Sequence, residues 1–168
     1  IYPELQKDLP KDVAARAQRI LSTCCGGCTG SYQATAGIQA IVDDVRKYIS
    51  ERDGLSLDEV DGNKIYLTNG ASEALATVMR AMIRTGLPKK DAILTPSPGF
   101  PQYNASITYM EGAEYCYQLV EEKNWGIDEK ELQAAYDAAV AGDCVPRCLV
   151  IINPSNPTGC VQSKEQLT

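Results

Sequence analysis

Short apolar runs alternate with helical patterns along the second half of the chain, and this alternation limits the possible fold more than any other feature. Four runs have the β-branched and aromatic composition of strands, namely 65–68, 92–95, 113–120 and 148–152. Apolar residues at helical spacing fill the stretches between them, over 71–85, 102–111 and 128–141. The alternation predicts an α/β fold with an open, mostly parallel sheet and helices on its faces.

Further helices are expected on either side of this pattern. Ser163, with Gln166 three residues later, has the spacing of a capping box. Apolar spacing predicts one helix over 8–22 and another from a cap at Thr35 to a stop at Gly54. A glycine-rich loop separates these two helices, and a polar connector follows them. We therefore predict a helical segment over residues 1–60 and an α/β part over residues 61–168.

Charge and hydropathy exclude several classes of protein. The 168 residues carry a net charge of −6 and their basic residues are scattered, whereas a nucleic-acid-binding surface needs a basic cluster. No apolar run approaches the ~18–20 residues that span a bilayer. Residues 1–12 carry charges that a signal peptide lacks. We expect no nucleic-acid partner, no membrane attachment and a cytoplasmic location.

The chain has seven cysteines and no histidine, and three of the cysteines lie close together. Cys25 and Cys28 have CxxC spacing, and Cys24 adds a third sulfur. A zinc site needs four ligands, and neither a second CxxC nor a histidine pair supplies the rest. No metal site is therefore predicted. Free thiols in a reducing compartment are the simplest interpretation, and a redox role for the CxxC pair stays open.

Three turns join predicted strands to predicted helices, which is where ligands bind in open α/β sheets. Small residues in TNGASEAL (68–75) let backbone N–H groups approach an anion at a helix start. Prolines stiffen TPSPGFPQY (95–103), which presents Phe100 and Tyr103 as flat surfaces. IINPSNPTG (151–159) holds Asn156 at the sheet edge. From the residues alone, an ordinary capped helix, core aromatics and a proline-stiffened turn stay open as alternatives.

These segments together resemble one family. NPSNPTG closely resembles the NPxNPTG signature of fold-type-I aminotransferases, which use pyridoxal 5′-phosphate. NGASEAL resembles that family's phosphate-binding turn, and PSPGFPQY resembles its cofactor-stacking loop. GSYQATAGI and NWGID look most like the alanine aminotransferases. The resemblance runs from about Pro10 to Thr168 and implies part of a three-layer α/β/α large domain, preceded by N-terminal helices.

The resemblance also implies which residues bind the cofactor. Backbone N–H groups of Ala71 and Ser72, with the Ser72 hydroxyl, would bind the cofactor phosphate. Tyr103 would stack on the pyridine ring. Asn156 would form a hydrogen bond with the phenolic oxygen of the ring and help to position the substrate carboxylate.

The resemblance also implies a residue near the substrate and a residue that acts across the interface of a homodimer. Gly37 would bring its backbone close to the substrate, and Tyr32 would reach the cofactor phosphate of the partner subunit.

The implied reaction moves an amino group between alanine and 2-oxoglutarate, giving pyruvate and glutamate. Another branch, such as an aromatic aminotransferase or an aminocyclopropane-carboxylate synthase, stays open, as does a non-catalytic α/β binding module. A nucleotide-binding domain is disfavoured because neither GxGxxG nor GxxxxGK[ST] occurs.

The lysine that anchors the cofactor in this family lies well downstream of NPxNPTG. This sequence ends nine residues after Gly159, and none of its lysines has that context. We therefore assign no catalytic residue and expect the 168-residue polypeptide alone to have no transaminase activity. We also expect it to self-associate, because family strands that would cover its sheet edge lie beyond these residues.

Overall fold

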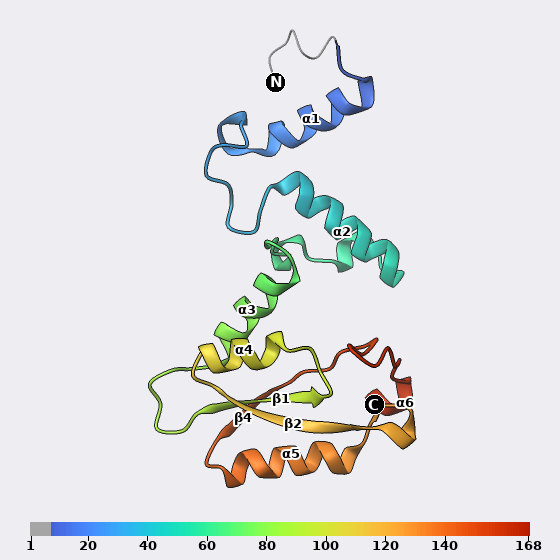
Figure 1. The fold of residues 1–168 in the computed structure, drawn as a ribbon. Coiled ribbons are helices and arrows are strands. Elements are labelled where there is room, and N and C mark those ends of the chain that lie inside the picture. The colour runs from blue at the N-terminus through green and yellow to red at the C-terminus, as the bar shows by residue number, and fades with distance from the viewer. Residues whose placement is uncertain (1–7) are drawn as a thin grey trace. The chain divides into compact units, whose positions relative to one another are not determined.

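The computed structural model describes residues 8–168 and is drawn in Figure 1. Residues 1–7 belong to the stretch whose charges argue against a signal peptide, and they lie outside the described part. The chain forms two compact units, which divide between Asn69 and Gly70. Within residues 8–168, no helix is long and apolar enough to cross a membrane.

The first unit is helical. Its α-helices are α1 (Lys11–Thr23) and α2 (Gln39–Asp53), and its 3-10 turns are η2 (Cys25–Gly27), η3 (Leu57–Glu59) and η4 (Gly62–Lys64). Arg19 of α1 joins the two helices. Its guanidinium donates to both carboxylate oxygens of Asp44, at 3.0 and 2.8 Å, and to the Ala40 carbonyl at 2.8 Å. Because Asp44 and Ala40 both belong to α2, this side chain links the two helices, as does Thr23 Oγ1, which accepts from the Ala40 N–H at 3.3 Å.

The start of α2 corrects the prediction that Thr35 caps it. Residues 35–36 form a turn, the Gly37 N–H donates to the Ala34 carbonyl at 2.9 Å, and the helix is capped instead by Ile38. The turn takes up the residues that a helix beginning at Thr35 would need. The predicted stop is confirmed, because Gly54 is left-handed with φ of 67°.

The predicted strand over 65–68 is wrong. This segment follows η4 and is not assigned to a strand. The Leu67 N–H donates to the Ala36 carbonyl at 2.9 Å, so the segment bonds to the turn before α2. Its composition favours extended backbone, but a strand also needs a neighbouring strand to pair with. In the described part of the chain no strand pairs with it.

The second unit, Gly70–Thr168, has an α/β architecture. Its elements are α3 (Ala71–Met82), β1 (Asp91–Ser97), α4 (Gln102–Tyr109), β2 (Ala113–Val120), η5 (Glu121–Lys123), β3 (Gly126–Ile127), α5 (Glu129–Ala141), β4 (Val145–Leu149) and α6 (Lys164–Leu167). The strand order is β3-β2-β1-β4. β1 pairs in parallel with β2 and β4, and β3 is antiparallel to β2. The prediction of a mostly parallel sheet is confirmed.

Helices cover both faces of this sheet (Figure 1). α3 and α4 lie on one face, where Met79, Ile93 and Ile107 form a core. α5 lies on the other face, where Leu94, Tyr117 and Ala135 form a second core. Ile93 and Leu94 are neighbours in β1 and supply one core each, because successive strand residues point to opposite faces. The three-layer arrangement follows from this alternation.

Several element boundaries differ from the predictions. α3 ends at Met82 rather than 85, because Ile83 is extended and buried in the core. α4 ends at Tyr109 rather than 111. β4 spans 145–149 rather than 148–152, and its pairing with β1 shifts register where Pro146 offers no N–H. The short β3 was not predicted. The capping box at Ser163 is confirmed, and Asp128 caps α5.

Candidate functional site

The N-terminus of α3 has the geometry of an anion site. Gly70 is its N-cap, with φ of 86° and ψ of 175°, a conformation that residues with a Cβ rarely adopt. Glycine has no side chain with which to cap the helix. The first N–H groups of an α-helix have no carbonyl partner within the helix, and the helix dipole favours an anion there. The first two helical residues, Ala71 and Ser72, are exposed.

Ser72 is joined to the N-terminus of α4 by two hydrogen bonds. Its Oγ donates to Oε1 of Gln102 at 2.9 Å, and Nε2 of Gln102 donates to the Ser72 carbonyl at 2.9 Å. Gln102 is the first residue of α4, and Tyr103 is the second. The bonds therefore join the first turn of α3 to the first turn of α4, which contains Tyr103. Sequence reasoning assigned no role to Gln102, because nothing local indicates a partner 30 residues away.

Tyr103 lies at the margin of the first core. Its ring meets that of Phe100 edge-on, with centroids 6.5 Å apart and an interplanar angle of 82°. It also packs against the cluster that contains Ile93 and Val150, and burial raises the pKa of its hydroxyl. The ring is thus partly a core residue, which was one of the alternatives. Its loop nevertheless holds it at the carboxyl end of β1.

A polar network beneath this loop was missed from the sequence. Glu114 of β2 accepts a hydrogen bond from Thr95 Oγ1 at 2.7 Å and another from Asn104 Nδ2. Thr95 belongs to β1 and Asn104 to α4, so the carboxylate fixes the start of α4 relative to the sheet. A cavity of about 180 Å³ is lined by these side chains and by Phe100 and Tyr103. Only the register of β1 and β2 brings Glu114 beside this loop.

The segment that carries Asn156 forms a closed turn after β4. The Ser155 N–H donates to the Cys160 carbonyl at 2.8 Å, and the Gly159 N–H donates to the Ser155 carbonyl at 2.7 Å. Asn156 lies inside this turn and is exposed. The segment begins next to β1, because the Val150 N–H donates to the Leu94 carbonyl at 2.8 Å. Asn156 therefore belongs to a segment that continues from the carboxyl end of β4.

Gln162 closes the far end of this segment and was also missed. The residue is buried, with 5% of its surface exposed. Its Oε1 accepts from the Ile127 N–H at 3.0 Å, and its Nε2 donates to the Trp125 carbonyl at 3.1 Å. Its own N–H donates to Asn153 Oδ1 at 3.0 Å. One buried amide thus fastens the turn to β3.

The remaining predicted site residues, Tyr32 and Gly37, belong to the first unit. The Tyr32 side chain is 99% exposed. Gly37 has φ of 114°, and a Cβ there would lie 2.7 Å from Cδ1 of Leu67. Packing within the first unit therefore already requires glycine at this position. Ala71, Ser72, Tyr103 and Asn156 all belong to the second unit.

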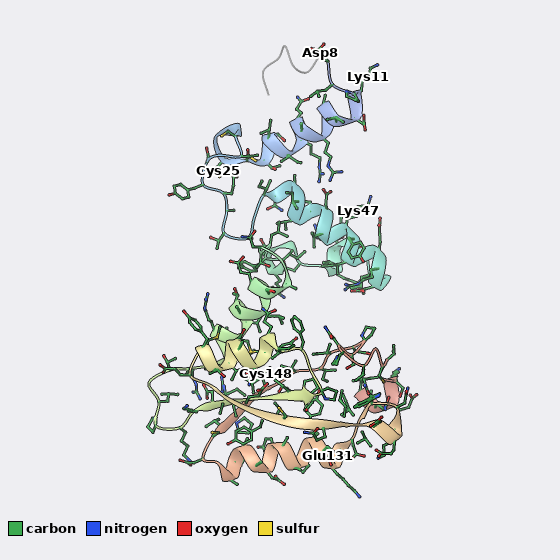
Figure 2. The ribbon with its side chains drawn as sticks, in the orientation of Figure 1. Asp8, Lys11, Cys25, Lys47, Glu131 and Cys148 are labelled. Atoms are coloured by element: carbon green, nitrogen blue, oxygen red, sulfur yellow. The ribbon has the colours of Figure 1, made fainter. Side chains whose placement is uncertain are left out.

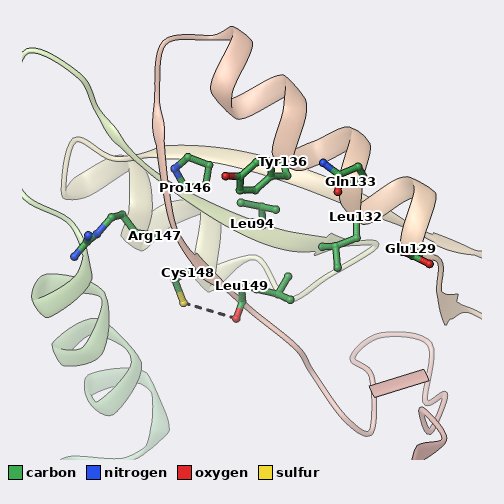
Figure 3. A pocket seen from close by; sticks show the side chains of 9 residues that line it. All are labelled: Leu94, Glu129, Leu132, Gln133, Tyr136, Pro146, Arg147, Cys148 and Leu149. Carbon is green, nitrogen blue, oxygen red and sulfur yellow. Dashed lines mark hydrogen bonds between the residues drawn. The ribbon is translucent and has the colours of Figure 1, made fainter. Parts of the chain in front are cut away.

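An apolar pocket of about 380 Å³ lies between α5 and β4 (Figure 3). Leu94, Leu132, Tyr136 and Leu149 contribute to its lining. None of the predicted site residues lines it. The pocket is on the α5 face of the sheet, whereas Tyr103 packs on the opposite face with α3 and α4. Among residues 8–168, no group of three or more histidine, cysteine or acidic residues could hold a metal ion.

Comparison with known proteins identifies the family. The family model described as aminotransferase class I and II matches residues 1–168. The chain belongs to this aminotransferase family. Its α/β fold with a mostly parallel sheet is the fold of solved aminotransferases. One is a tyrosine aminotransferase from Leishmania infantum, with a TM-score of 0.69 and 26% identity over 93% of this chain and 40% of that one.

Its relatives include proteins named as alanine aminotransferases. Alanine aminotransferase 2 from Xenopus laevis is 40% identical over 98% of this chain and 30% of its own length. Alanine aminotransferase 1 from Homo sapiens is 39% identical over 98% of this chain and 33% of its own length. The chain thus spans about a third of the length of the curated relatives it matches.

Aminotransferases of class I and II generally depend on pyridoxal 5′-phosphate, and the α3 turn fits the phosphate of that cofactor. The phosphate is an anion, and the backbone N–H groups of the glycine-capped first turn are the kind of donor that binds an anion at a helix N-terminus. The Ser72 hydroxyl donates its proton to Gln102 in this structure. The backbone groups of Ala71 and Ser72 are therefore the main donors that the turn offers.

Proposed function

We propose that the full-length protein containing these residues transfers an amino group between alanine and 2-oxoglutarate, with pyridoxal 5′-phosphate as cofactor. The products are pyruvate and glutamate. The observation that carries the proposal is the hydrogen-bonded pair Ser72 and Gln102, which unites an anion-binding turn and an aromatic loop in one place. The identity of 39–40% to relatives named as alanine aminotransferases supports alanine as the donor.

The residues have separate tasks in this proposal. The first turn of α3, with Ala71 and Ser72, binds the cofactor phosphate. Tyr103 orients the pyridine ring by stacking, and Asn156 forms a hydrogen bond with its phenolic oxygen and helps to position the substrate carboxylate. When bound, the cofactor supplies a carbonyl group that accepts the amino group and a ring that withdraws electrons. Gly37 brings its backbone close to the substrate.

An assay of the full-length protein with different amino-group donors tests the substrate. We expect kcat/KM with 2-oxoglutarate to be at least about tenfold higher for alanine than for tyrosine or aspartate. A preference for tyrosine would replace the proposal with the aromatic branch. Cofactor binding without transfer from any donor would favour a binding module. The aromatic branch has a specific observation in its favour, the similarity to a solved tyrosine aminotransferase.

The 168-residue polypeptide alone is proposed to be inactive. None of its lysines has the context of the cofactor-anchoring lysine of the family. Formation of pyruvate from alanine and 2-oxoglutarate by this polypeptide would refute the proposal.

We further propose that the full-length protein is a cytoplasmic homodimer in which Tyr32 contributes to the cofactor site of the partner subunit. The nearly complete exposure of Tyr32 supports a role in contact with another molecule, and the seven free cysteines suit a reducing compartment. Mixing a Tyr32→Phe subunit with a subunit inactivated at Asn156 tests the arrangement. Hybrid dimers should recover activity in one of their two sites, whereas sites built from one subunit only should recover none.

A further inference from the structure

The loop between α1 and α2 holds three cysteines, and Figure 2 labels one of them, Cys25. Cys24 is buried, with 7% of its side chain exposed, whereas Cys25 and Cys28 are exposed. All three are free thiols. None of them has a part in the proposed aminotransferase function. Two of the three are therefore open to reagents in solution.

The backbone between Cys25 and Cys28 forms a tight turn. The two residues between them, Gly26 and Gly27, have φ of 67° and 65°. Positive φ at both central residues is typical of a type I′ turn, which brings its first and fourth Cα atoms within about 7 Å. Disulfides join Cα atoms about 4.4–6.8 Å apart. The turn therefore brings the Cα atoms of the two exposed cysteines into the range that a disulfide joins.

Neighbouring groups stabilise the thiolate of Cys28. Its Sγ accepts a hydrogen bond from the Gly30 N–H at 3.2 Å, and the Ser31 hydroxyl lies 3.9 Å away. These donors lower the pKa of the Cys28 thiol. The thiolate is the nucleophile in thiol–disulfide exchange. Cys28 is therefore the thiol of the pair that we expect to attack first.

The side chain of Gln33 holds the loop in this shape. Its Oε1 accepts from the Cys25 N–H at 3.0 Å, and its Nε2 donates to the carbonyls of Cys28 and Ser31 at 3.1 and 2.9 Å. The amide thus connects the two ends of the turn. The separation of the two cysteines is therefore fixed by the folded loop and does not depend on a chance encounter of flexible ends.

We propose that Cys25 and Cys28 form a dithiol modification site that reacts with low-molecular-weight disulfides such as glutathione disulfide. The Cys28 thiolate attacks one glutathione sulfur, and the S–S bond of the reagent breaks with release of one glutathione thiolate. Cys25 then loses its proton to solvent and attacks the Cys28 sulfur, which releases the second glutathione thiolate. Two protein thiols are oxidised to one disulfide, and the reagent is reduced to two thiols.

Mass spectrometry of the reduced full-length protein after incubation with glutathione disulfide tests the proposal. Trypsin releases residues 20–46 as one peptide that contains all three cysteines. We expect this peptide to lose two hydrogens and to keep one alkylatable thiol. Cys25→Ser should instead accumulate a mixed disulfide with glutathione on Cys28. Cys28→Ser should form neither product at a comparable rate.

Two controls make the result decisive. Cys24→Ala removes the buried neighbour and should leave the internal disulfide unchanged. Cys116 is another exposed cysteine, and it should take up glutathione several-fold more slowly than Cys28 does in the Cys25→Ser variant. The proposal is overturned if Cys24→Ala abolishes the internal disulfide, if Cys28→Ser retains it, or if Cys116 reacts as fast as Cys28.

Discussion

Asp91 forms an ion pair with Arg84 in the second unit. Its side chain is fully buried at the start of β1. It accepts hydrogen bonds from the backbone N–H of Arg84 at 2.8 Å and from Nε and Nη2 of the same residue at 2.9 and 2.7 Å. The bonds from Arg84 lower the pKa of Asp91 to about 2. The carboxylate thereby fixes the chain that leads from α3 into β1.

Asp91→Asn should destabilise the protein by about 1–3 kcal/mol at neutral pH, because a buried network loses its charged acceptor. Since the folded pKa of about 2 is below the unfolded value near 3.9, the carboxylate stabilises the fold above about pH 4. This contribution is lost as the pH falls through 2. Urea unfolding at about pH 6 and about pH 2 measures the difference. A gap between wild type and variant that stays constant with pH would contradict the assignment.

Ser72→Ala should weaken cofactor binding only moderately. The variant loses one hydroxyl but keeps the backbone N–H groups of the first turn of α3, which we regard as the main phosphate donors. The Kd of the full-length protein for pyridoxal 5′-phosphate should rise several-fold, as an absorbance titration would measure. Thr108→Ala, at the exposed end of α4, is the matched control and should leave Kd unchanged. An unchanged Kd for Ser72→Ala would mean that the Ser72 hydroxyl does not contribute to cofactor binding.

At the scale of residues, the sequence located the turns but not the side chains that fasten them. Gly70 and Tyr103 lie in motifs that can be recognised because their neighbours have restricted backbone conformations. Gln102, Glu114 and Gln162 act through partners on other elements. Nothing in the local sequence distinguishes such residues from ordinary polar residues, because their partners are set by strand register and helix packing.

At the scale of elements, the turn before α2 depends on the absence of a side chain at Gly37. Gly37→Ala should cost about 2–4 kcal/mol, because φ of 114° is strained for alanine and its Cβ would lie 2.7 Å from Leu67. Gly54→Ala shares positive φ, but nothing lies within 4 Å of its Cβ. It should cost only about 1 kcal/mol. Denaturant unfolding of the two variants separates the clash from the strain.

A Gly37→Ala,Leu67→Ala double variant provides a further check. Removing the Leu67 side chain relieves the contact but leaves the strain, so the double variant should lose less than the sum of the two single changes. Strict additivity would mean that Gly37 is required for its backbone conformation alone.

The order of elements in the second unit followed from the sequence because apolar periodicity and caps are local signals. Ser163 accepts a hydrogen bond from the first turn of α6, as predicted, and Asp128 does the same for α5. Boundaries were less predictable where tertiary contacts decided them. Ile83 continues the apolar spacing of α3, but it lies after the end of that helix, where it is extended and buried in the core. The segment 65–68 has the composition of a strand but bonds to a loop.

At the scale of the molecule, the α5 face of the sheet leaves apolar surface exposed beyond β4. Ile151 is 45% exposed and lines a second pocket of about 540 Å³, which Leu149 and α6 also border. Within residues 8–168, β4 is an edge strand whose outer side is unpaired. Exposed edges beside apolar surface favour association between chains.

Ile151→Lys should therefore reduce self-association of the 168-residue polypeptide, because a charge at this edge opposes docking of another chain. Light scattering and size-exclusion chromatography over a concentration series measure the effect. Leu87→Lys is the matched control, since Leu87 has the same 45% exposure but does not line either pocket. If both variants reduced self-association equally, the effect would be due to net charge alone.

The pair formed by Ser72 and Gln102 has a consequence for how this sequence can vary. Loss of the glutamine side chain removes both hydrogen bonds between α3 and α4, whereas replacement of the serine removes only one, because the other ends on a backbone carbonyl. A small residue at position 72 therefore keeps one of the two hydrogen bonds, whereas a residue at 102 without an amide or similar polar group keeps neither. Without glutamine at 102, the two helices remain joined by the apolar core to which Met79 of α3 and Ile107 of α4 belong.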